Sequence, residues 1–529
     1  MQTLITWCGL AGVQEWVCCP GGRNAAMLKA LSLCSGLKLW THFDERAAAF
    51  FALGRMQDTA RPVAVSVTSG TAAAELLPAV IEAYYQGRPL IVVTADRPSA
   101  FSGTGAPQSI EQRNIFGIYA SACELEYPVS AASLPDLESQ VAAGRPVHIN
   151  IHLPEPRLDD VCPPFSSPVA EAPPLPPFRS SLSDLSRMLQ FRAQEGLALL
   201  LGGLEPEEQE PALWLAKTLR VPILADATSG LREEEELSPH VLHDGDAVLS
   251  SCPPPFVLRV GDVPAGRFWR DLEALPRTEV FSISRTGFSG LARPSHVVQG
   301  DLDAVLRVLG DVPHVGDTLN LRRFSHRREA LIEDLILTYP ESEAALTRTL
   351  SLQACLGNRI FLGNSSPVRL WNLYAQRQLP VYYVRANRGA NGIEGLLATF
   401  LGNAAAGGEA WCFLGDLSAL YDANAGLLHR QLPRGKRVVA VLNNHGGGIF
   451  RSLQGGDSLT DEMERLLVQP HDLDMQALAD LWGARALRLC CSADFELLDQ
   501  LGDEDFALAE IVPDAEQTEA FNRRMAETK

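Results

Sequence analysis

The sequence predicts an α/β protein made of three domains, each with a doubly wound parallel sheet. Runs of β-branched and aliphatic residues alternate with segments of helical composition along the whole 529-residue chain. This alternation is typical of β–α–β units, whose strands are parallel. The chain is also too long for one hydrophobic core. A Pro- and Ser-rich stretch near residue 170 interrupts the alternation and predicts the first domain boundary.

The first domain is expected at residues 1–160. "PVAVSVTSG" (Pro62–Gly70) predicts a strand, "TAAAELLPAVIEAYYQG" (Thr71–Gly87) a helix that Gly87 ends, and "RPLIVVTADRP" (Arg88–Pro98) the next strand. These three segments form one β–α–β unit. "PVHINIHLPEP" (Pro146–Pro156) predicts the last strand, which runs out into the linker.

Residues 161–180 are expected to be a Pro-rich, semi-rigid linker, followed by a central α/β domain at residues 181–320. A charged helical stretch from Arg322 to Leu337 leads to the third domain at residues 341–529. The strands expected in the central domain are Leu197–Gly203, Val221–Gly230, Phe256–Asp262 and Thr278–Ser284. Those of the third domain lie in "RIFLGNSSPVRL", "PVYYVRANRGANGIEG", "AWCFLGDLSAL", "RVVAVLNNHGGGIF" and "ALAEIVPD".

Composition and charge exclude several classes of partner. Apolar residues make up 46% and charged residues 21%, as in ordinary globular proteins. The net charge of −19 argues against a broad nucleic-acid or anionic-membrane surface, so an anionic ligand needs a local cationic cluster. Of the 45 basic residues, 40 are Arg, which suits bidentate binding of carboxylates but also fits a bias of the genome.

The expected compartment is the cytoplasm. The 11 cysteines are scattered, with no CxxC pair and no metal-ligand spacing, so we expect reduced thiols. The N-terminal segment has no basic stretch before its apolar run, and Glu15 interrupts that run, so no signal peptide is predicted. No segment has 18 uncharged apolar residues, and we therefore expect no integral membrane segment.

Two strand ends in the third domain carry polar residues that suit a metal and a diphosphate. A strand ends at Gly415-Asp416, and a helix is expected from about Ser418. After a further 25 residues, the next strand ends at Asn443-Asn444, followed by His445 and three glycines. In an open parallel sheet, ligands collect at the carboxyl ends of strands. A carboxylate, a carboxamide and glycine carbonyls at such an edge suit Mg²⁺ shared with a diphosphate, and the helix N-terminus favours a phosphate.

Each of these features has an ordinary structural explanation when it is taken singly. Asp is a common residue at helix N-termini, and Asn-Gly turns are common in loops. Their occurrence on successive strand ends is what favours a metal–diphosphate site.

The chain contains "GDL" followed, after 25 residues, by "NN". This pattern resembles the motif of thiamine-diphosphate-dependent enzymes, which usually have GDG where this chain has GDL. The resemblance implies the three-domain fold of those enzymes, with a pyrimidine-binding first domain and a diphosphate-binding third domain. It also implies thiamine diphosphate with Mg²⁺, or Mn²⁺ in its place. The implied metal ligands are Asp416, Asn444 and the carbonyl of Gly446. The other implied cofactor contacts are Gly415, Leu417, Ser418, Ile449, Phe450 and Leu453.

A glutamate of the first domain completes the resemblance. These enzymes need a glutamate that hydrogen-bonds the aminopyrimidine ring and activates the cofactor, whose own chemistry stabilises the carbanion. Glu45 in "THFDERAAAFFALGRM" stands where the family places it. By itself, Glu45 would more simply be an acidic residue in the first turn of a helix.

Longer segments resemble one family, the 2-succinyl-5-enolpyruvyl-6-hydroxy-3-cyclohexene-1-carboxylate (SEPHCHC) synthases of menaquinone biosynthesis. They include "VTSGTAAAELLPAVIEA", "LIVVTADRP", "GAPQSIEQRNIFG", "FLGNSSPVRLWN", "NRGANGIEG" and "GDLSALYDANA", in the first and third domains. The implied reaction is decarboxylation of 2-oxoglutarate followed by conjugate addition to isochorismate. The positions implied to bind substrate are Arg23, Arg97, Gln108, Ser365, Arg369 and Arg388. The family also implies a homodimer or homotetramer whose active sites are shared between subunits.

The chain departs from the family pattern at a few positions. Gly22 replaces a serine, Pro107 replaces an asparagine, and at the family's basic pair Arg267 matches one position while Phe268 occupies the other. These departures concern isochorismate binding and leave the cofactor motif unaffected.

Two other classes of function remain open at this point. One is a different thiamine-dependent enzyme, such as a 2-oxoacid decarboxylase or an acetolactate-synthase-like enzyme, although many simple decarboxylases have a His-His pair that this chain lacks. The other is a non-catalytic protein that retains the cofactor, which Glu45, Asp416 and Asn444 argue against. A nicotinamide enzyme is disfavoured because no GxGxxG follows the first strand.

Overall fold

The computed structural model describes residues 1–155, 162–171, 182–357, 359–452 and 459–527. It divides into two compact units, and each is treated by itself. Unit 1 comprises Met1–Pro176, Gly389–Gly407 and Tyr421–Arg434, and unit 2 comprises Pro177–Arg388, Gly408–Leu420 and Gly435–Lys529. Three large parallel sheets with helices on their faces confirm the predicted α/β class.

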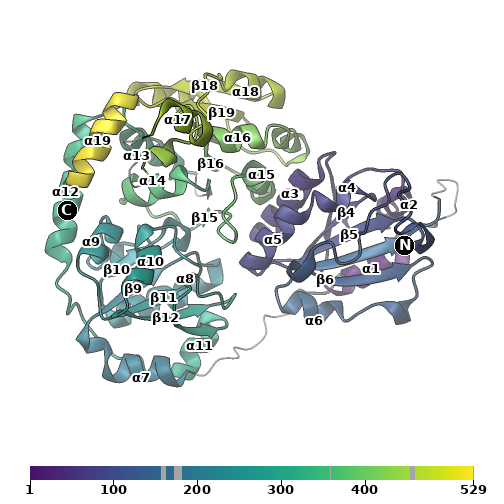
Figure 1. Cartoon of the computed structure of the whole chain (residues 1–529), viewed down its shortest axis with the longest axis horizontal. Coiled ribbons are helices and arrows are strands. Elements are labelled where there is room, and N and C mark those ends of the chain that lie inside the picture. The colour runs from purple at the N-terminus through teal and green to yellow at the C-terminus, as the bar shows by residue number, and fades with distance from the viewer. Residues whose placement is uncertain (156–161, 172–181, 358, 453–458, 528–529) are drawn as a thin grey trace. The chain divides into compact units, whose positions relative to one another are not determined.

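Unit 1 contains a six-stranded parallel sheet of order β3-β1-β4-β5-β7-β6. Helices α1 and α6 cover one face, where their apolar residues join the strand residues in one core cluster, and α3 and α5 pack together on the other face (Figure 1). The strands are β1 (Glu15–Cys18), β3 (Lys38–Thr41), β4 (Val63–Val67), β5 (Leu90–Asp96), β6 (Ser121–Glu126) and β7 (Val147–His152). The helices are α1 (Gln2–Leu10), α2 (Ala25–Ser32), α3 (Glu45–Thr59), α4 (Thr71–Ala74), α5 (Leu77–Gln86) and α6 (Leu137–Ala142).

The single helix expected over Thr71–Gly87 is two helices, α4 and α5. Pro78 lies in the first turn of α5, where its missing N–H leaves no bond unmade. Gly87 ends α5 in the left-handed conformation, as the sequence predicts.

Helix α15 (Leu396–Asn403) belongs to unit 1 although it comes late in the chain. It packs on α3 at very short range, since a Cβ atom on Gly54 would lie 2.0 Å from the carbonyl oxygen of Thr399. Only glycine permits this approach of the two helix backbones.

Part of the predicted linker also belongs to unit 1. Strand β8 (Phe165–Ser166) pairs with β2 (Cys34–Ser35), and Ala170 donates its N–H to the carbonyl of Gly9 at 3.0 Å. Residues 161 and 172–180 of the predicted linker lie outside the described residues. The domain boundaries stay predictions.

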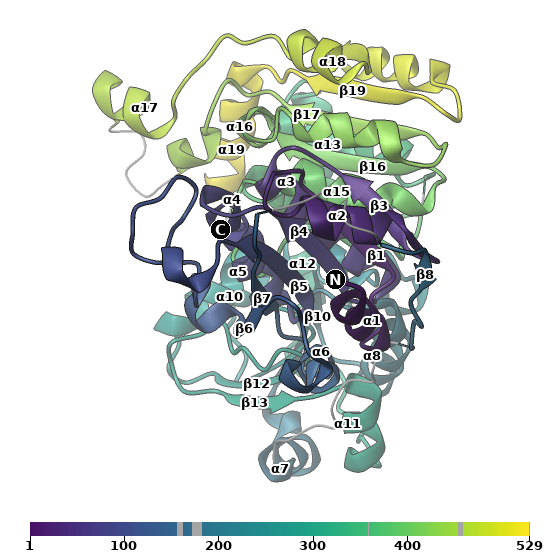
Figure 2. The ribbon, with the colours of Figure 1, turned by 90° about the vertical axis from the view of Figure 1, so that its right-hand side faces the viewer.

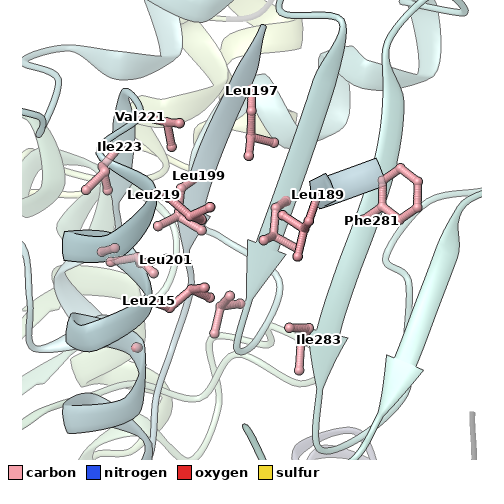
Figure 3. Close-up of a cluster of buried hydrophobic side chains, with 14 of the residues drawn as sticks. Leu189, Leu197, Leu199, Leu201, Leu215, Leu219, Val221, Ile223, Phe281 and Ile283 are labelled. Carbon is pink, nitrogen blue, oxygen red and sulfur yellow. The ribbon is translucent and has the colours of Figure 1, made fainter. Parts of the chain in front are cut away.

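The first sheet of unit 2 has five parallel strands in the order β10-β9-β11-β12-β13. Its core is mainly aliphatic, with Leu197, Leu199 and Leu201 of β9 facing Leu215 and Leu219 of α8 (Figure 3). The strands are β9 (Leu197–Leu201), β10 (Ile223–Ala225), β11 (Phe256–Val260), β12 (Glu279–Ser284) and β13 (His296–Gln299). The helices are α7 (Ser183–Phe191), α8 (Pro206–Leu219), α9 (Gly245–Ser251), α10 (Arg267–Asp271) and α11 (Leu302–Leu309).

The second sheet of unit 2 has six parallel strands in the order β15-β14-β16-β17-β19-β18, and β16, β17 and β19 are labelled in Figure 2. The strands are β14 (Ile360–Leu362), β15 (Val384–Arg385), β16 (Ala410–Gly415), β17 (Arg437–Leu442), β18 (Arg485–Leu489) and β19 (Phe506–Ile511). The helices are α12 (Arg322–Thr338), α13 (Glu343–Ala354), α14 (Ser366–Tyr374), α16 (Asp416–Tyr421), α17 (Asp461–Leu467), α18 (Gln476–Trp482) and α19 (Ala515–Glu527).

Two further features concern the cysteines and the helices. All eleven cysteines are free thiols. Among the described helices, none combines the length and the apolar character that crossing a membrane requires.

Candidate active site

The predicted residues of the third domain lie after four neighbouring strands of one sheet. The strand order places β14 next to β16, while α14 leads from β14 to β15 on its other side. The chain therefore reverses its winding direction between β14 and β16, and such a switch point opens a crevice at the carboxyl ends of the strands. Residues 364–369 follow β14, Arg388 follows β15, Asp416 follows β16 and Asn444 follows β17.

Asp416 is a buried carboxylate that joins the ends of β16 and β17. Its Oδ1 accepts the N–H of Leu417 at 2.6 Å, and its Oδ2 accepts the N–H of Gly446 at 2.7 Å. Helix α16 begins at Asp416 itself, two residues earlier than expected. Burial raises the pKa of Asp416, while its bonds to Gly446 and Leu417 act in the opposite direction.

His471 is a second partner of Asp416. The His471 Nδ1 accepts the N–H of Leu473 at 3.2 Å, so in the neutral ring the proton is on Nε2. Nε2 lies 3.2 Å from Asp416 Oδ2 and donates to it. Three donors thus occupy Asp416, and a carboxylate with about four acceptor positions keeps one for a further ligand.

The two adjacent amides of the sequence have different surroundings. Asn443 is buried and donates to Glu510 Oε1 at 2.6 Å and to the carbonyl of Leu473 at 3.2 Å, so it ties strand ends together. Asn444 is half-buried and donates its Nδ2 to Glu343 Oε1 at 2.7 Å. This bond directs the Asn444 carbonyl oxygen away from Glu343, as a metal ligand requires.

Gly446 takes a backbone conformation that favours glycine, with φ of +129°. A Cβ atom at this position would meet the carbonyl oxygen of Val468 at 2.5 Å. The N–H of Gly446 contacts Asp416, and its carbonyl accepts the N–H of Gly448 at 2.8 Å. A carbonyl oxygen has two lone pairs, so one is left for a further contact. The role of this oxygen as a metal ligand stays a prediction.

The donors of this group fit a divalent cation that is shared with a phosphate ligand. Glu343 is half-buried, and burial together with nearby Asp416 raises its pKa, while the bond from Asn444 lowers it. A cation beside the two carboxyl groups would relieve their mutual repulsion. Within the described ranges, no group of three or more His, Cys, Asp or Glu side chains could hold a metal by itself. A metal at Asp416 and Asn444 therefore needs further oxygen ligands, and a diphosphate supplies such ligands.

The other predicted cofactor contacts surround the same strand ends. Gly415 ends β16, and a Cβ atom there would meet no heavy atom within 4 Å, which leaves open space beside the backbone. Ser418 is buried and Leu417 is half-buried in α16. Ile449 and Phe450 lie in the 3-10 turn Gly448–Ser452, and Phe450 is exposed. Leu453 lies outside the described residues.

In unit 1, Glu45 is the first residue of α3. Asp44 caps the helix by accepting the N–H of Ala47 at 3.0 Å, and Glu45 is the acidic residue of the first turn, as its ordinary structural explanation expects. Glu45 is half-buried, and burial raises the pKa of its carboxyl group, with Asp44 and Glu75 adding to the effect. A raised pKa favours the protonated form of the carboxyl group, which a residue that takes up and returns a proton requires.

Three of the predicted substrate residues gather around α14 in unit 2. Ser365 precedes the helix with φ of +70° and ψ of −127°, a conformation that is costly for a residue other than glycine. Its carbonyl accepts Nη1 of the exposed Arg369 at 2.7 Å. Arg388 donates Nη1 to Asn364 Oδ1 at 3.0 Å. Although part of the Arg369 side chain is exposed, partial burial lowers its pKa, and the nearby Arg388 and Arg270 lower it further, while Asp246 acts in the opposite direction. These three arginines therefore lie near one another, with one carboxyl group beside them.

The three predicted substrate residues of unit 1 differ in their surroundings. Arg23 is buried, and its guanidinium donates to the carbonyl of Pro154 at 3.0 Å and to Glu155 at 3.1 Å. Arg97 is half-buried, with Nε bonded to the carbonyl of Pro107 at 3.0 Å, and Gln108 is exposed with φ of +55°. Arg97 and Gln108 therefore belong to one loop region, whereas the contacts of Arg23 anchor the segment after β7.

Comparison with known proteins identifies the family. The chain is 53% identical over 529 residues to the 2-succinyl-5-enolpyruvyl-6-hydroxy-3-cyclohexene-1-carboxylate synthase of Akkermansia muciniphila, covering 99% of this chain and 98% of that protein. The chain belongs to the SEPHCHC synthase family. The synthase of the same name from Bdellovibrio bacteriovorus is 36% identical over 89% of this chain and 88% of its own length.

Two further comparisons agree with membership of the SEPHCHC synthase family. Residues 1–115 match the profile of the thiamine pyrophosphate enzyme N-terminal TPP binding domain. A crystal structure described as that of a candidate thiamin diphosphate-dependent enzyme from Mycobacterium smegmatis has a TM-score of 0.70, covering 96% of this chain and 98% of that chain. At 17% identity, that likeness concerns the fold.

Three residues near the candidate site escaped the sequence analysis of this SEPHCHC synthase family member. Glu343 and His471 are distant in sequence from the strand ends that they contact, and no spacing pattern indicates them. Arg270 is three residues from Arg267, the match to the family's basic pair. The closeness of Arg270 to Arg267 in the sequence could have indicated it, and both residues lie on the short helix α10.

Proposed function

We propose that this protein is a thiamine-diphosphate- and Mg²⁺-dependent SEPHCHC synthase that acts on 2-oxoglutarate and isochorismate. Its main support is identity of 53% across almost the whole length of a synthase of that name. Glu45, Asp416 and Asn444, which the resemblance links to cofactor activation and metal binding, are all present.

Asp416 and Asn444 would hold the metal, with the carbonyl of Gly446 as a third ligand and Mn²⁺ as a substitute for Mg²⁺. Asn444 is oriented for this role by Glu343, and Asp416 by the backbone N–H groups of Leu417 and Gly446. Gly415, Leu417, Ser418, Ile449, Phe450 and Leu453 would line the cofactor site. When bound, thiamine diphosphate supplies the nucleophilic carbon and the electron sink for a carbanion.

Glu45 would hold a proton beside the aminopyrimidine ring. The bond that breaks in 2-oxoglutarate is the one to its 1-carboxylate, which leaves as CO₂. The bond that forms joins the remaining four-carbon unit to the ring of isochorismate, whose conjugated double bond accepts the electron pair and then a proton.

Both substrates are polyanions, so cations must hold them. Arg369 and Arg388 would bind carboxylates in unit 2, together with Ser365, and the nearness of the two arginines to each other supports this assignment. Arg97 and Gln108 would contribute from unit 1. Arg23 is assigned to the same pocket by resemblance, although its guanidinium already bonds to Pro154 and Glu155.

The proposed assembly is a homodimer or homotetramer. Glu45 belongs to unit 1 and the Asp416 group to unit 2. In the proposed arrangement, Glu45 of one subunit and Asp416 of another complete each active site.

Mass spectrometry of the products tests the proposed function. The protein is incubated with 2-oxoglutarate and isochorismate, with and without thiamine diphosphate and Mg²⁺. Formation of SEPHCHC and CO₂ only when both substrates and the cofactor are present supports the proposal. Release of succinic semialdehyde or formation of an acetolactate-type product instead would favour another thiamine-dependent reaction.

A further inference from the structure

A buried glutamate of unit 1 binds the backbone of the segment that follows Arg388. Glu82 lies on α5 and is only 3% exposed. Its Oε1 accepts the N–H of Gly389 at 2.7 Å, and its Oε2 accepts those of Ala390 at 2.6 Å and Asn391 at 3.3 Å. Three successive backbone donors, which follow Glu82 by 307 to 309 positions in sequence, thus converge on one carboxyl group.

The side of Glu82 that faces α3 is also fixed. Gln86, one turn later on α5, donates Nε2 to Glu82 Oε1 at 2.6 Å, and Gln57 of α3 donates to Gln86 Oε1 at 3.0 Å. Buried hydrogen bonds to a charged group are stronger than those between neutral groups, and a carboxyl group held by several of them has a single orientation.

The contact also depends on the residue type at position 389. A Cβ atom on Gly389 would lie 2.7 Å from the carbonyl oxygen of Glu82 and 2.9 Å from Cβ of Tyr85. Only glycine lets the segment approach α5 closely enough for all three bonds.

The far end of the same segment has its own carboxylate. Asp422 is fully buried and accepts the N–H of Gly395 at 2.8 Å and of Leu397 at 2.9 Å, at the start of α15. The segment Gly389–Gly395 is therefore held at both ends, by Glu82 next to Arg388 and by Asp422 next to the helix.

We propose that Glu82 is a positioning residue for Arg388. It fixes the peptide groups directly after Arg388, and through the covalent backbone it limits the directions that the Arg388 side chain can take toward a substrate carboxylate. This inference rests on the proposed function, because Arg388 binds substrate only in that proposal. A guanidinium contact to a carboxylate depends on direction, so loss of the restraint should weaken substrate binding without removing a substrate contact.

The central variant is Glu82→Gln in the full-length protein with thiamine diphosphate and Mg²⁺. It keeps the size of the side chain but replaces one acceptor oxygen by an NH₂ group. The matched control is Glu138→Gln on α6, where the glutamate is exposed. Gly389→Ala disturbs the same contact from the side of the backbone donors. It is the test variant if Glu82→Gln does not fold.

Hydrogen–deuterium exchange tests the contact independently of activity. In Glu82→Gln the amides of residues 389–391 should exchange at least about tenfold faster, while those of Gly395 and Leu397, held by Asp422, keep their protection. Unchanged exchange at residues 389–391 would overturn the proposal.

Kinetics test the link to Arg388. Glu82→Gln should raise the KM of the substrate that responds to Arg388→Ala by about tenfold, with kcat within about twofold of wild type. In the Arg388→Ala background the same change should have almost no further effect. A fall in kcat alone, or effects that simply add in the double variant, would mean that Glu82 does not act through Arg388. A wild-type protein that forms no SEPHCHC would instead refute the proposed function, and the exchange experiment would then decide whether Glu82 holds the segment.

Discussion

The side-chain amide of Asn444 donates to Glu343 at 2.7 Å, although 101 residues separate the two in sequence. Asn444 follows β17 and Glu343 begins α13, so the bond joins two elements that the fold brings together. It fixes which end of the amide faces Glu343, and therefore where the carbonyl oxygen points.

Removing Glu343 should accordingly weaken the metal-dependent binding of thiamine diphosphate. We expect Glu343→Ala to lower the affinity for thiamine diphosphate by about twofold to tenfold, as for the loss of one hydrogen bond of typical strength. Asp416→Ala removes a proposed metal ligand and should lower the affinity much further while the fold survives. Calorimetric titration with Mg²⁺ measures both, with the exposed Glu516→Ala as control. Equal affinity in Glu343→Ala and the control would show that Asn444 needs no such support.

Glu45 is expected to activate the cofactor without holding it. Glu45→Gln should bind thiamine diphosphate within about tenfold of wild type, or about 1.4 kcal/mol. Exchange of the thiazolium C2 proton, followed by NMR, should slow greatly because the variant lacks the carboxyl group that we propose to lie beside the aminopyrimidine. Exchange as fast as in wild type would remove Glu45 from this role.

Glu45 and Asp416 should complement each other between subunits if active sites are shared. Glu45→Gln and Asp416→Ala proteins, each nearly inactive, are mixed under conditions that exchange subunits. One of the two sites in a mixed dimer then has both residues intact, and activity should partly return. Native mass spectrometry establishes that mixed dimers have formed. Mixed dimers without activity would falsify the shared site.

Arg369 and Arg388 should act on substrate and not on cofactor. Each charged hydrogen bond is worth about 1.5–3 kcal/mol, so Arg369→Ala and Arg388→Ala should raise a substrate KM by roughly tenfold or more. Replacing either arginine by Lys should restore only part of the lost substrate affinity, because an ammonium group cannot make the planar two-bond contact. Steady-state kinetics with each substrate varied in turn are compared with Arg322→Ala and Arg323→Ala, which alter exposed residues of α12. If all four Ala variants had the same KM for each substrate, Arg369 and Arg388 would be excluded from the anion pocket.

The buried His148 should make the folded protein less stable in acid. It is fully buried in β7, and burial lowers its pKa to about 4. Thr94 donates to Asn150 at 2.7 Å, so His148 Nε2 is the donor in its 2.8 Å bond to Thr94, and the ring is neutral. Between pH 6.5 and 4 the unfolded chain binds this proton and the folded chain does not, so stability falls as the pH falls.

The expected loss from His148 is about 2 kcal/mol between pH 6.5 and pH 5. Urea unfolding at the two pH values measures it in wild type and in His148→Gln, with the exposed His326→Gln as control. The pH dependence should shrink in His148→Gln alone. An equal slope in all three proteins would show that another group causes the acid sensitivity.

The amino-acid sequence was enough to predict the class of fold and the place to look for a site. Strands such as Val63–Val67 and Arg437–Leu442 are buried along their whole length, so apart from Ser66 and Arg437 they appear as apolar runs whose ends are easy to locate. Their carboxyl ends must meet at one edge of a parallel sheet. The polar residues after β16 and β17 could therefore be paired by their positions in the chain.

Tertiary packing, in contrast, determines which polar groups serve each other. Asn443 and Asn444 are identical in type and adjacent in sequence, yet one bonds to Glu510 and the other to Glu343. Glu82 looks like any helical glutamate until the close approach of Gly389 brings three backbone donors to it. Hydrophobic periodicity records which face of an element is buried, because burial repeats along the chain. A hydrogen bond between residues 101 or 307 positions apart leaves no such repeat, since it depends on how separate elements pack.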